Sequence, residues 1–378
     1  MKIILCRNLV GLFVVILCLS SLPILNVKTQ TFMTITIAND GSIDPKTAPI
    51  QYSGNIYTLT DDINGNIIIL EDDIILDGNG FTLQGDGTAT GIFLKTRTNV
   101  VIKDFKITNF KQGIQLEPIY IVHVSNPGEG CNNITISGNT ITNNDIGIKC
   151  YHASNTFLYG NNLQNNNIGL SLWNCVSSVL RENQMWYNER NLVMSSYSVT
   201  STATDDIDAS NLVNGRRIYY LINKHNMTVP YDAGMVVLVK CSEITVENLV
   251  LTNNRIGLAL VETTDSLVKN NIIANNGEGI RLVDSSNNTI TENILANNSQ
   301  FNLISDSENI FFDNEFPSEV PELPTPPPLL PTPSPTPTTT PTPSPSPEPF
   351  PTTLAVVSIA IIAVIATGIL VYFKKYKK

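Results

Sequence analysis

A period of 22 residues runs through most of this chain and limits the fold to a repeating one. Steps of 22 residues in both directions from Gly147 lead to glycine at most positions, provided that a 12-residue insertion after Leu116 is left out of the count. We call this set of positions the glycine phase. The residue after most of these positions is apolar, and so is the residue two positions further on. Each recurring set forms an apolar column along the repeat. Side chains two residues apart point to the same side of a strand, so each period contains a buried strand. The phase comprises Gly91, Gly113, Gly147, Gly169, Asn191, Gly257, Gly279 and Phe301, the first column Ile92, Ile114, Ile148, Leu170, Leu192, Leu258 and Ile280, and the second Leu94, Leu116, Cys150, Leu172, Met194, Leu260, Leu282 and Ile304.

Two more apolar columns recur with the same period and mark two further strands in each coil. A solenoid with this coil length and no helical segment is a parallel β-helix, which rises about 4.8 Å per coil. We therefore predict an all-β solenoid over residues 32–316, with insertions near 117–130 and 198–234. The columns are Ile107, Ile141, Leu163, Met185, Leu251, Ile273 and Leu295, and Ile102, Ile136, Leu158, Leu180, Val246, Val268 and Ile290.

Asparagine fills two turn columns of the repeat. Stacked amides can hydrogen-bond along the axis of an in-register parallel stack. We therefore assign these asparagines a structural role and not a catalytic one. The columns are Asn109, Asn143, Asn165, Asn253, Asn275 and Asn297, and Asn139, Asn161, Asn183, Asn271 and Asn293.

Three cysteines share a small-residue column of the repeat. Cys131, Cys175 and Cys241 are two and three periods apart, and Cys150 belongs to a leucine column. Two coils span about 10 Å, beyond the roughly 7 Å between Cα atoms that a disulfide tolerates. We therefore expect free, packed thiols. The alternative is metal capture by cysteine with histidine or methionine.

The charge distribution excludes some partners. The chain carries a net charge of -10, and many of its basic residues lie near the two ends, so the middle is acidic. Nucleic acid and anionic lipid surfaces both require clustered lysine and arginine. We therefore expect no nucleic-acid partner. Neutral sugars and cations remain possible, and the sequence requires no cofactor.

Both ends resemble membrane-targeting segments. Residues 1–31 have the layout of a secretory signal peptide, with an uncleaved N-terminal anchor as the alternative. Residues 354–373 form an uncharged apolar run long enough to span a bilayer, and residues 374–378 form a basic tail that the positive-inside rule places in the cytoplasm. The proline-, threonine- and serine-rich segment 317–353 predicts an extended stalk. We expect a single-pass protein of the cell membrane with an extracellular solenoid.

The repeat contains the motifs Asp77-Gly78-Asn79-Gly80, Gly91-Ile92-Phe93-Leu94 and Asn99-Val100-Val101-Ile102. These motifs resemble the NosD-like family of right-handed parallel β-helix proteins, whose domain is shared with carbohydrate-binding and sugar-hydrolysing β-helices. The segment Asn211-Leu212-Val213-Asn214-Gly215, leading to Ile218-Tyr219-Tyr220-Leu221, is similar to an insertion in archaeal surface members. The resemblance implies a right-handed β-helix of an archaeal envelope. It also implies an alternative function, copper-site assistance, since the namesake helps to mature the copper site of nitrous oxide reductase.

A polysaccharide lyase or hydrolase on this scaffold needs clustered carboxylates, or carboxylates with a metal and a basic residue. The sequences Gly-His-Gly and Arg-Ile-Lys of polygalacturonases are absent. The segment 198–234 concentrates the weak catalytic candidates Asp205, Asp206, Asp208, Arg216 and His225. The alternative is that this segment is a polar, solvated loop.

Sugar binding without turnover has a different basis. Tyr151 and Trp173 are one period apart, each one residue beyond an inward position, so both are expected to point outward on adjacent coils. Such a pair forms an aromatic platform, and His152 and Asn174 beside it can supply hydrogen bonds. The alternative is an aromatic pair that only stabilises the sheet. We assign no metal ligands.

The sequence thus indicates a cell-surface-anchored β-helix that acts as a binding or structural module, with an extracellular or cell-surface polysaccharide as the expected partner. Its glycosylation candidates are Asn133, Asn226 and Asn287, each followed by x-Thr. Asn297 has the same type of motif, but we expect it to be the poorest acceptor because its column is an amide ladder.

Overall fold

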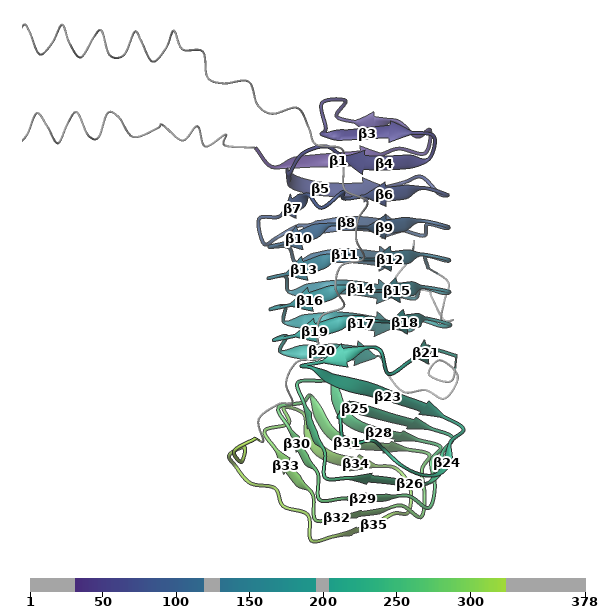
Figure 1. The fold of residues 1–378 in the computed structure, drawn as a ribbon, viewed down its shortest axis with the longest axis vertical. Coiled ribbons are helices and arrows are strands. Elements are labelled where there is room, and N and C mark those ends of the chain that lie inside the picture. The colour runs from purple at the N-terminus through teal and green to yellow at the C-terminus, as the bar shows by residue number, and fades with distance from the viewer. Residues whose placement is uncertain (1–30, 119–129, 195–203, 324–378) are drawn as a thin grey trace, which may run out of the picture. The chain divides into compact units, whose positions relative to one another are not determined.

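The structure is a computed structural model that describes residues 31–118, 130–194 and 204–323. The regular structure in these ranges consists of β-strands, and none of these residues forms a helix of the length and apolarity that a membrane crossing requires. Figure 1 shows the strands stacked coil upon coil. Residues 1–30 of the predicted signal peptide (1–31) and residues 324–353 of the predicted stalk (317–353) lie outside the described residues, as do the predicted membrane helix 354–373 and basic tail 374–378.

The first stack of coils carries three series of parallel strands. Its longest strands are β1 (Met33–Ile37), β5 (Ile63–Ile69), β8 (Thr90–Lys95), β11 (Gln112–Glu117), β14 (Ile146–Tyr151), β17 (Ile168–Trp173) and β20 (Arg190–Met194). A second series contains β7 (Thr82–Gln84), β10 (Lys106–Thr108), β13 (Thr140–Thr142), β16 (Asn162–Gln164), β19 (Gln184–Trp186) and β22 (Leu212–Val213). The third contains β4 (Ile56–Leu59), β6 (Ile75–Asp77), β9 (Val101–Lys103), β12 (Thr135–Ser137), β15 (Phe157–Tyr159), β18 (Val179–Arg181) and β21 (Asp206–Ile207). The hairpin strands β2 (Ile43–Asp44) and β3 (Ile50–Ser53) pair antiparallel with β1 and β4.

The pairing register confirms the predicted three strands per coil. Ile148 faces Leu170 between β14 and β17, Ile136 faces Leu158 between β12 and β15, and each partner lies 22 residues further along the chain. The apolar columns of this stack fill its core, where most of their side chains have no exposed surface. The alternation of buried and exposed residues in each strand therefore sets the inside and the outside of the coil.

Buried asparagine side chains tie neighbouring coils together. Asn139, Asn161, Asn183 and Asn211 form a ladder in which each Nδ2 donates to the next Oδ1 at 2.9 to 3.0 Å. Asn161 Nδ2 also donates to the carbonyl of Ile136 at 2.8 Å. This confirms the predicted amide ladder for the column that contains Asn161.

The other predicted asparagine column is exposed or half-buried, with one amide rung from Asn297 Nδ2 to Asn275 Oδ1 at 2.7 Å, and the buried ladder lies one residue later in the sequence. Asn143 and Asn165 are exposed and adopt φ values of 56° and 53°, a left-handed conformation that asparagine tolerates better than most residues. The buried ladder runs through the next residue, because Asn144 Nδ2 donates to Asn166 Oδ1 at 3.1 Å and Asn166 to Asn188 at 3.0 Å. Consecutive asparagines at these turns concealed which of the two is buried.

We expect Asn161→Ala to destabilise the fold by at least about 2 kcal/mol, because the amide donors of Asn139 and the carbonyl of Ile136 lose a buried partner. Urea unfolding of the purified protein measures this change. Asn167→Ala is the matched control, since its exposed side chain makes one bond, to Asp145, and should change stability by less than about 0.5 kcal/mol. Equal effects of the two substitutions would contradict a stabilising role for the ladder.

A tight hairpin reverses the chain after β22 and starts a second stack. Asn214 and Gly215 have φ values of 48° and 79° and join β22 to β23 (Arg216–Ile222), which pair antiparallel. Asn-Gly with positive φ at both positions is the preferred two-residue hairpin turn. Residues 204–234 of the predicted insertion therefore contain ordered strands, of which β21 and β22 extend the first stack.

The second stack repeats the three-strand coil. One series of its strands consists of β23, β25 (Ala233–Val239), β28 (Ile256–Val261), β31 (Glu278–Val283) and β34 (Phe301–Ser305). The other two series are β24 (His225–Thr228), β26 (Ser242–Glu247), β29 (Leu267–Lys269), β32 (Thr289–Thr291) and β35 (Ile310–Phe312), and β27 (Val250–Thr252), β30 (Ile272–Ala274) and β33 (Ile294–Ala296).

The strand β25 separates two hydrophobic cores. Val236 and Leu238 belong to the core of the second stack, whereas Met235, Val237 and Val239 pack into the core of the first. Every residue of β25 is buried, which explains its continuous apolar sequence. The 22-residue count from Asn191 to Gly257 therefore spans a chain reversal at the Asn214-Gly215 turn, which the sequence analysis did not predict.

One further column assignment is wrong in the last coil. Ile280 pairs with Leu303, and Leu282 pairs with Ser305, at a spacing of 23 residues. An extra residue in the preceding turn, where Asn298 Nδ2 donates to Asn302 Oδ1 at 2.9 Å, shifts the register. Ser305 and not Ile304 therefore continues the column of Leu282, and Leu303 continues the column of Ile280.

The four cysteines of the described ranges are free and buried, as predicted: Cys131, Cys150, Cys175 and Cys241. Burial raises the pKa of the Cys175 thiol to about 12. Burial likewise raises the pKa of the Cys131 thiol. These thiols stay protonated at neutral pH and are part of the packing.

Candidate functional site

Outward side chains of β15, β18 and β21 bring aromatic, basic and acidic groups together on one face of the first stack. Leu158, Leu180 and Ile207 point into the core, so the residues on either side of them in these strands face outward. We name this surface the β15/β18 site; it consists of Phe157, Tyr159, Arg181, Glu182, Asp206 and Asp208.

Two parallel aromatic rings lie on β15. Phe157 and Tyr159 are 37% and 41% exposed, and their ring centroids are 6.0 Å apart with 4° between the planes. A hydrogen bond to Glu182 raises the pKa of the Tyr159 hydroxyl. Two aromatic faces therefore stand in solvent beside a carboxylate.

Arg181 organises the polar half of the site. Its Nη1 donates to the carbonyls of Leu180 and Asp206, both at 2.8 Å, and its Nη2 donates to Asp206 Oδ2. Its Nε lies 3.2 Å from Asp208 Oδ2. The site thus contains one guanidinium, which is paired with Asp206 and Asp208, and a third carboxylate at Glu182, so its formal net charge is -2.

Asp205 sits behind this surface and not on it. The residue is 5% exposed, and its Oδ1 accepts a hydrogen bond from the backbone N–H of Ser178 at 2.8 Å. Burial raises the pKa of its carboxyl to about 6. Of the three predicted aspartates, Asp206 and Asp208 thus reach the surface, and Asp205 ties the residues that precede β21 to those that precede β18.

Asp205 should make stability depend on pH. The folded protein holds this proton more tightly than the unfolded chain, whose aspartates titrate near 3.8, so the contribution is full below about pH 4 and is lost as the pH rises through about 6. Asp205→Asn removes the titration and retains an oxygen acceptor for Ser178. Its stability relative to the unsubstituted protein should rise by about 1–3 kcal/mol between pH 4 and pH 7.5. Urea unfolding at both pH values measures this difference, and a constant difference would contradict the buried carboxyl.

The predicted aromatic platform occupies a different corner of the coil. Tyr151 and Trp173 are register partners of β14 and β17, and Trp173 is 44% exposed. Lys149 Nζ lies 5.8 Å from the centre of the Tyr151 ring, which also meets the His152 ring edge-on at 4.5 Å between centroids. The structure therefore places the two aromatic residues side by side.

The polar partners predicted for this platform are less accessible. His152 is 3% exposed, and its Nε2 lies 3.1 Å from Asn174 Nδ2. A histidine this deeply buried offers little surface to a ligand. Asn174 remains at the edge of the platform, half-buried.

The last two catalytic candidates lie on other strands. Arg216 is on β23, where it lines a cavity of about 160 Å³ with Val213 and Gly234, and burial lowers the pKa of its guanidinium. His225 is exposed on β24, with Nδ1 2.8 Å from Ser242 Oγ. The five catalytic candidates therefore do not form one site.

The glycosylation candidates Asn133, Asn226 and Asn287 are all exposed. Asn297 is also exposed, and its Nδ2 donates to Asn275 Oδ1 at 2.7 Å. The expected ranking of Asn297 as the poorest acceptor therefore depends on this one surface bond and not on burial.

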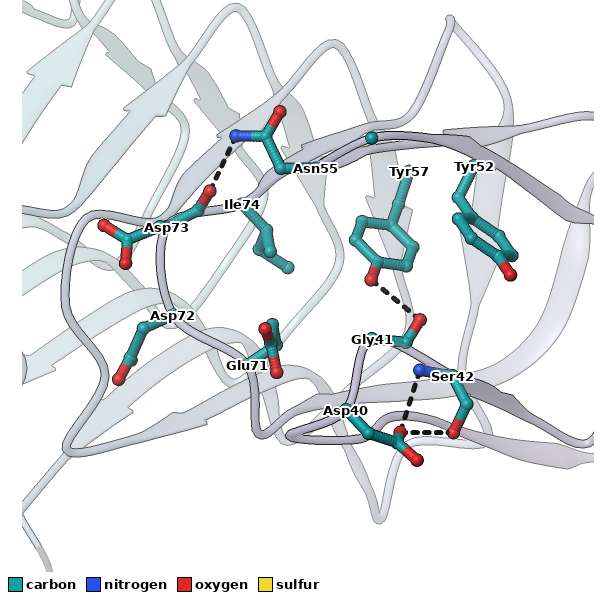
Figure 2. Close-up of a pocket in the computed structure, with 11 residues that line it drawn as sticks. Asp40, Gly41, Ser42, Tyr52, Asn55, Tyr57, Glu71, Asp72, Asp73 and Ile74 are labelled. Atoms are coloured by element: carbon teal, nitrogen blue, oxygen red, sulfur yellow. Dashed lines mark hydrogen bonds between the residues drawn. The ribbon is translucent and has the colours of Figure 1, made fainter.

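A cavity of about 420 Å³ opens near β3 and β4 (Figure 2). Tyr52 and Tyr57 stack along it with ring centroids 5.6 Å apart, and Tyr57 donates to the carbonyl of Gly41 at 2.8 Å. Acidic side chains line the rest, but Asp40 and Asp72 accept bonds from the backbone N–H groups of nearby turns. These contacts make the acidic residues part of the loop structure at the start of the first stack.

Among the described residues, no three histidine, cysteine, aspartate or glutamate side chains are grouped so as to hold a metal ion. His123 lies outside these residues.

Sequence reasoning found Asp206 and Asp208 but missed Phe157, Tyr159, Arg181 and Glu182. The signal was present, because Phe157 and Tyr159 flank the inward Leu158 and Arg181 follows Leu180 by one residue. The sequence did not show that β21 pairs with β18, which places Asp206 on the same face of the solenoid as Arg181.

Comparisons with known proteins give similarities of fold. The chain is similar to the A-module of mannuronan C-5 epimerase AlgE4 from Azotobacter vinelandii, with 16% identity over 68% of this chain and 78% of that chain and a TM-score of 0.34. It is also similar to PfbA, a surface adhesin of Streptococcus pneumoniae (14%, 68% and 62%, TM-score 0.28), and to an alginate lyase from Paenibacillus sp. str. FPU-7 (12%, 67% and 88%, TM-score 0.23).

No curated protein matches the chain. The family model of the right handed beta helix region matches residues 66–215 and 207–319. These matches cover more than half of the sequence, and the chain therefore belongs to the right handed beta helix region family.

Proposed function

We propose that this protein is a surface-displayed β-helix that binds glycans through the β15/β18 site. The observation that carries the proposal is the pair of exposed, parallel rings of Phe157 and Tyr159 beside the hydrogen-bonded Arg181 cluster. A sugar presents apolar C–H faces and hydroxyl edges, so it is matched by aromatic surface next to oriented polar groups.

The site is held rigid before any ligand arrives. Its strands are fixed by inward Leu158 and Leu180, and Arg181 is held by four contacts to oxygen. Side chains that are already ordered lose little conformational entropy on binding. A shallow site of this kind can therefore bind a sugar chain without rearrangement.

The surface location is part of the same proposal. A signal peptide at 1–31, a stalk at 317–353 and a membrane helix at 354–373 would display the solenoid outside the cell, with residues 374–378 in the cytoplasm. This layout supports the archaeal surface type indicated by the NosD-like resemblance.

Polysaccharide cleavage is the second candidate function, because the fold brings Asp206 and Asp208 together at Arg181. A hydrolase or lyase would use these carboxylates in acid or base roles. Release of reducing ends or unsaturated sugars by the protein, abolished in Asp206→Asn/Asp208→Asn, would establish it.

The copper-accessory alternative has less support, since His152 is buried and His225 lies on the second stack.

Alanine substitutions distinguish the two aromatic surfaces. Tyr159→Ala should weaken retention on an immobilised polysaccharide about fivefold, because one stacking ring contributes on the order of 1 kcal/mol. Trp173→Ala is the matched control, with a similarly exposed ring on another face, and should leave retention unchanged. Affinity electrophoresis measures both. If only Trp173→Ala loses retention, the glycan binds at the Tyr151 and Trp173 platform and not at the β15/β18 site.

A further inference from the structure

We propose that the β15/β18 site selects glycans that lack acidic groups, with amine-bearing sugars preferred and uronate polymers excluded. The inference rests on the proposed function and adds the charge class of the ligand. It follows from how the charged side chains of this face are paired.

The single cation of the site is occupied by the protein itself. Arg181 directs its guanidinium to the carbonyls of Leu180 and Asp206 and to the carboxylates of Asp206 and Asp208. A guanidinium has five N–H donors, so few remain for a ligand carboxylate. A uronate would have to displace an internal ion pair in order to be neutralised.

The next cation on this face is paired in the same way. Lys103 on β9 occupies the column that continues through Ser137 to Tyr159. Its Nζ contacts Asp77 Oδ2 and lies 3.1 Å from Asp104 Oδ2. Both cations of the column are therefore engaged by two carboxylates each, and neither supplies a free positive charge to a sugar chain.

The carboxylates themselves remain accessible. The side chains of Asp206 and Asp208 are 64% and 45% exposed, and Glu182 bonds to the hydroxyl at the rim of the aromatic pair. An ammonium group on a sugar would meet acceptors of opposite charge, whereas a uronate would meet like charge. The preference should weaken at high salt because the groups are solvent-exposed.

Three hexasaccharides that differ in charge test the inference: glucosamine hexamer, N-acetylglucosamine hexamer and galacturonate hexamer. Calorimetric titration into the full-length protein in 50 mM NaCl at pH 6 should give the strongest binding for the amine, then the N-acetyl form. We expect at least tenfold tighter binding of the amine than of the galacturonate, and a smaller ratio in 500 mM NaCl.

The double variant Asp206→Asn/Asp208→Asn should reduce the amine-to-galacturonate ratio below about threefold, because it removes two negative charges and frees Arg181. Asp265→Asn/Asp313→Asn is the matched control: it makes the same charge change at two exposed positions of the second stack, where φ values of 52° and 51° suit asparagine. This control should keep the full ratio.

The outcomes separate the two proposals. Galacturonate binding that equals or exceeds amine binding, and is weakened by Tyr159→Ala, would overturn the charge selection and leave glycan binding standing. Equal loss of selectivity in both double variants would also overturn it, since the effect would then come from net charge. Absence of Tyr159-dependent binding for all three hexamers would overturn both.

Discussion

Hydrogen bonding between successive coils is the constraint on which the rest of this molecule depends. Backbone pairing at a spacing of 22 residues aligns each strand with the next, and the buried amides of Asn139, Asn161 and Asn183 satisfy the turns where that pairing stops. A buried polar turn without such partners would cost more free energy than a small solenoid can supply. The amide ladders therefore satisfy the polar groups of the turns that enclose the largely apolar core.

This arrangement leaves the outward positions free for function. Inward residues must match the neighbouring coils, but outward residues need only remain compatible with a strand. Phe157 and Tyr159 on β15 and Arg181 on the neighbouring strand β18 occupy such outward positions, and the buried Asp205 accepts a hydrogen bond from Ser178 behind them. The site is thus a local property of the coils near the hairpin, where the first stack ends and β25 covers its core.

The repeat made the strands and the core predictable, because burial repeats wherever the backbone pairs. It did not reveal the reversal at Asn214-Gly215, because the second stack happens to return to the same phase at Gly257. Consecutive asparagines also hid which column is buried, since either can fill a turn. The Tyr151 and Trp173 neighbours were predicted from spacing alone, whereas the pairing of Arg181 with Asp206 depends on where β21 rejoins the sheet.

The central claim is that a sugar chain lies on Phe157 and Tyr159 beside the Arg181 cluster. The most direct measurement is a crystal structure of the protein with glucosamine hexamer bound. The account predicts a sugar ring stacked against the Phe157 or Tyr159 ring, with its polar groups within hydrogen-bond distance of Asp206 or Glu182. A hexamer bound on Tyr151 and Trp173, or in the cavity near Tyr52, with the β15/β18 site empty, would contradict it.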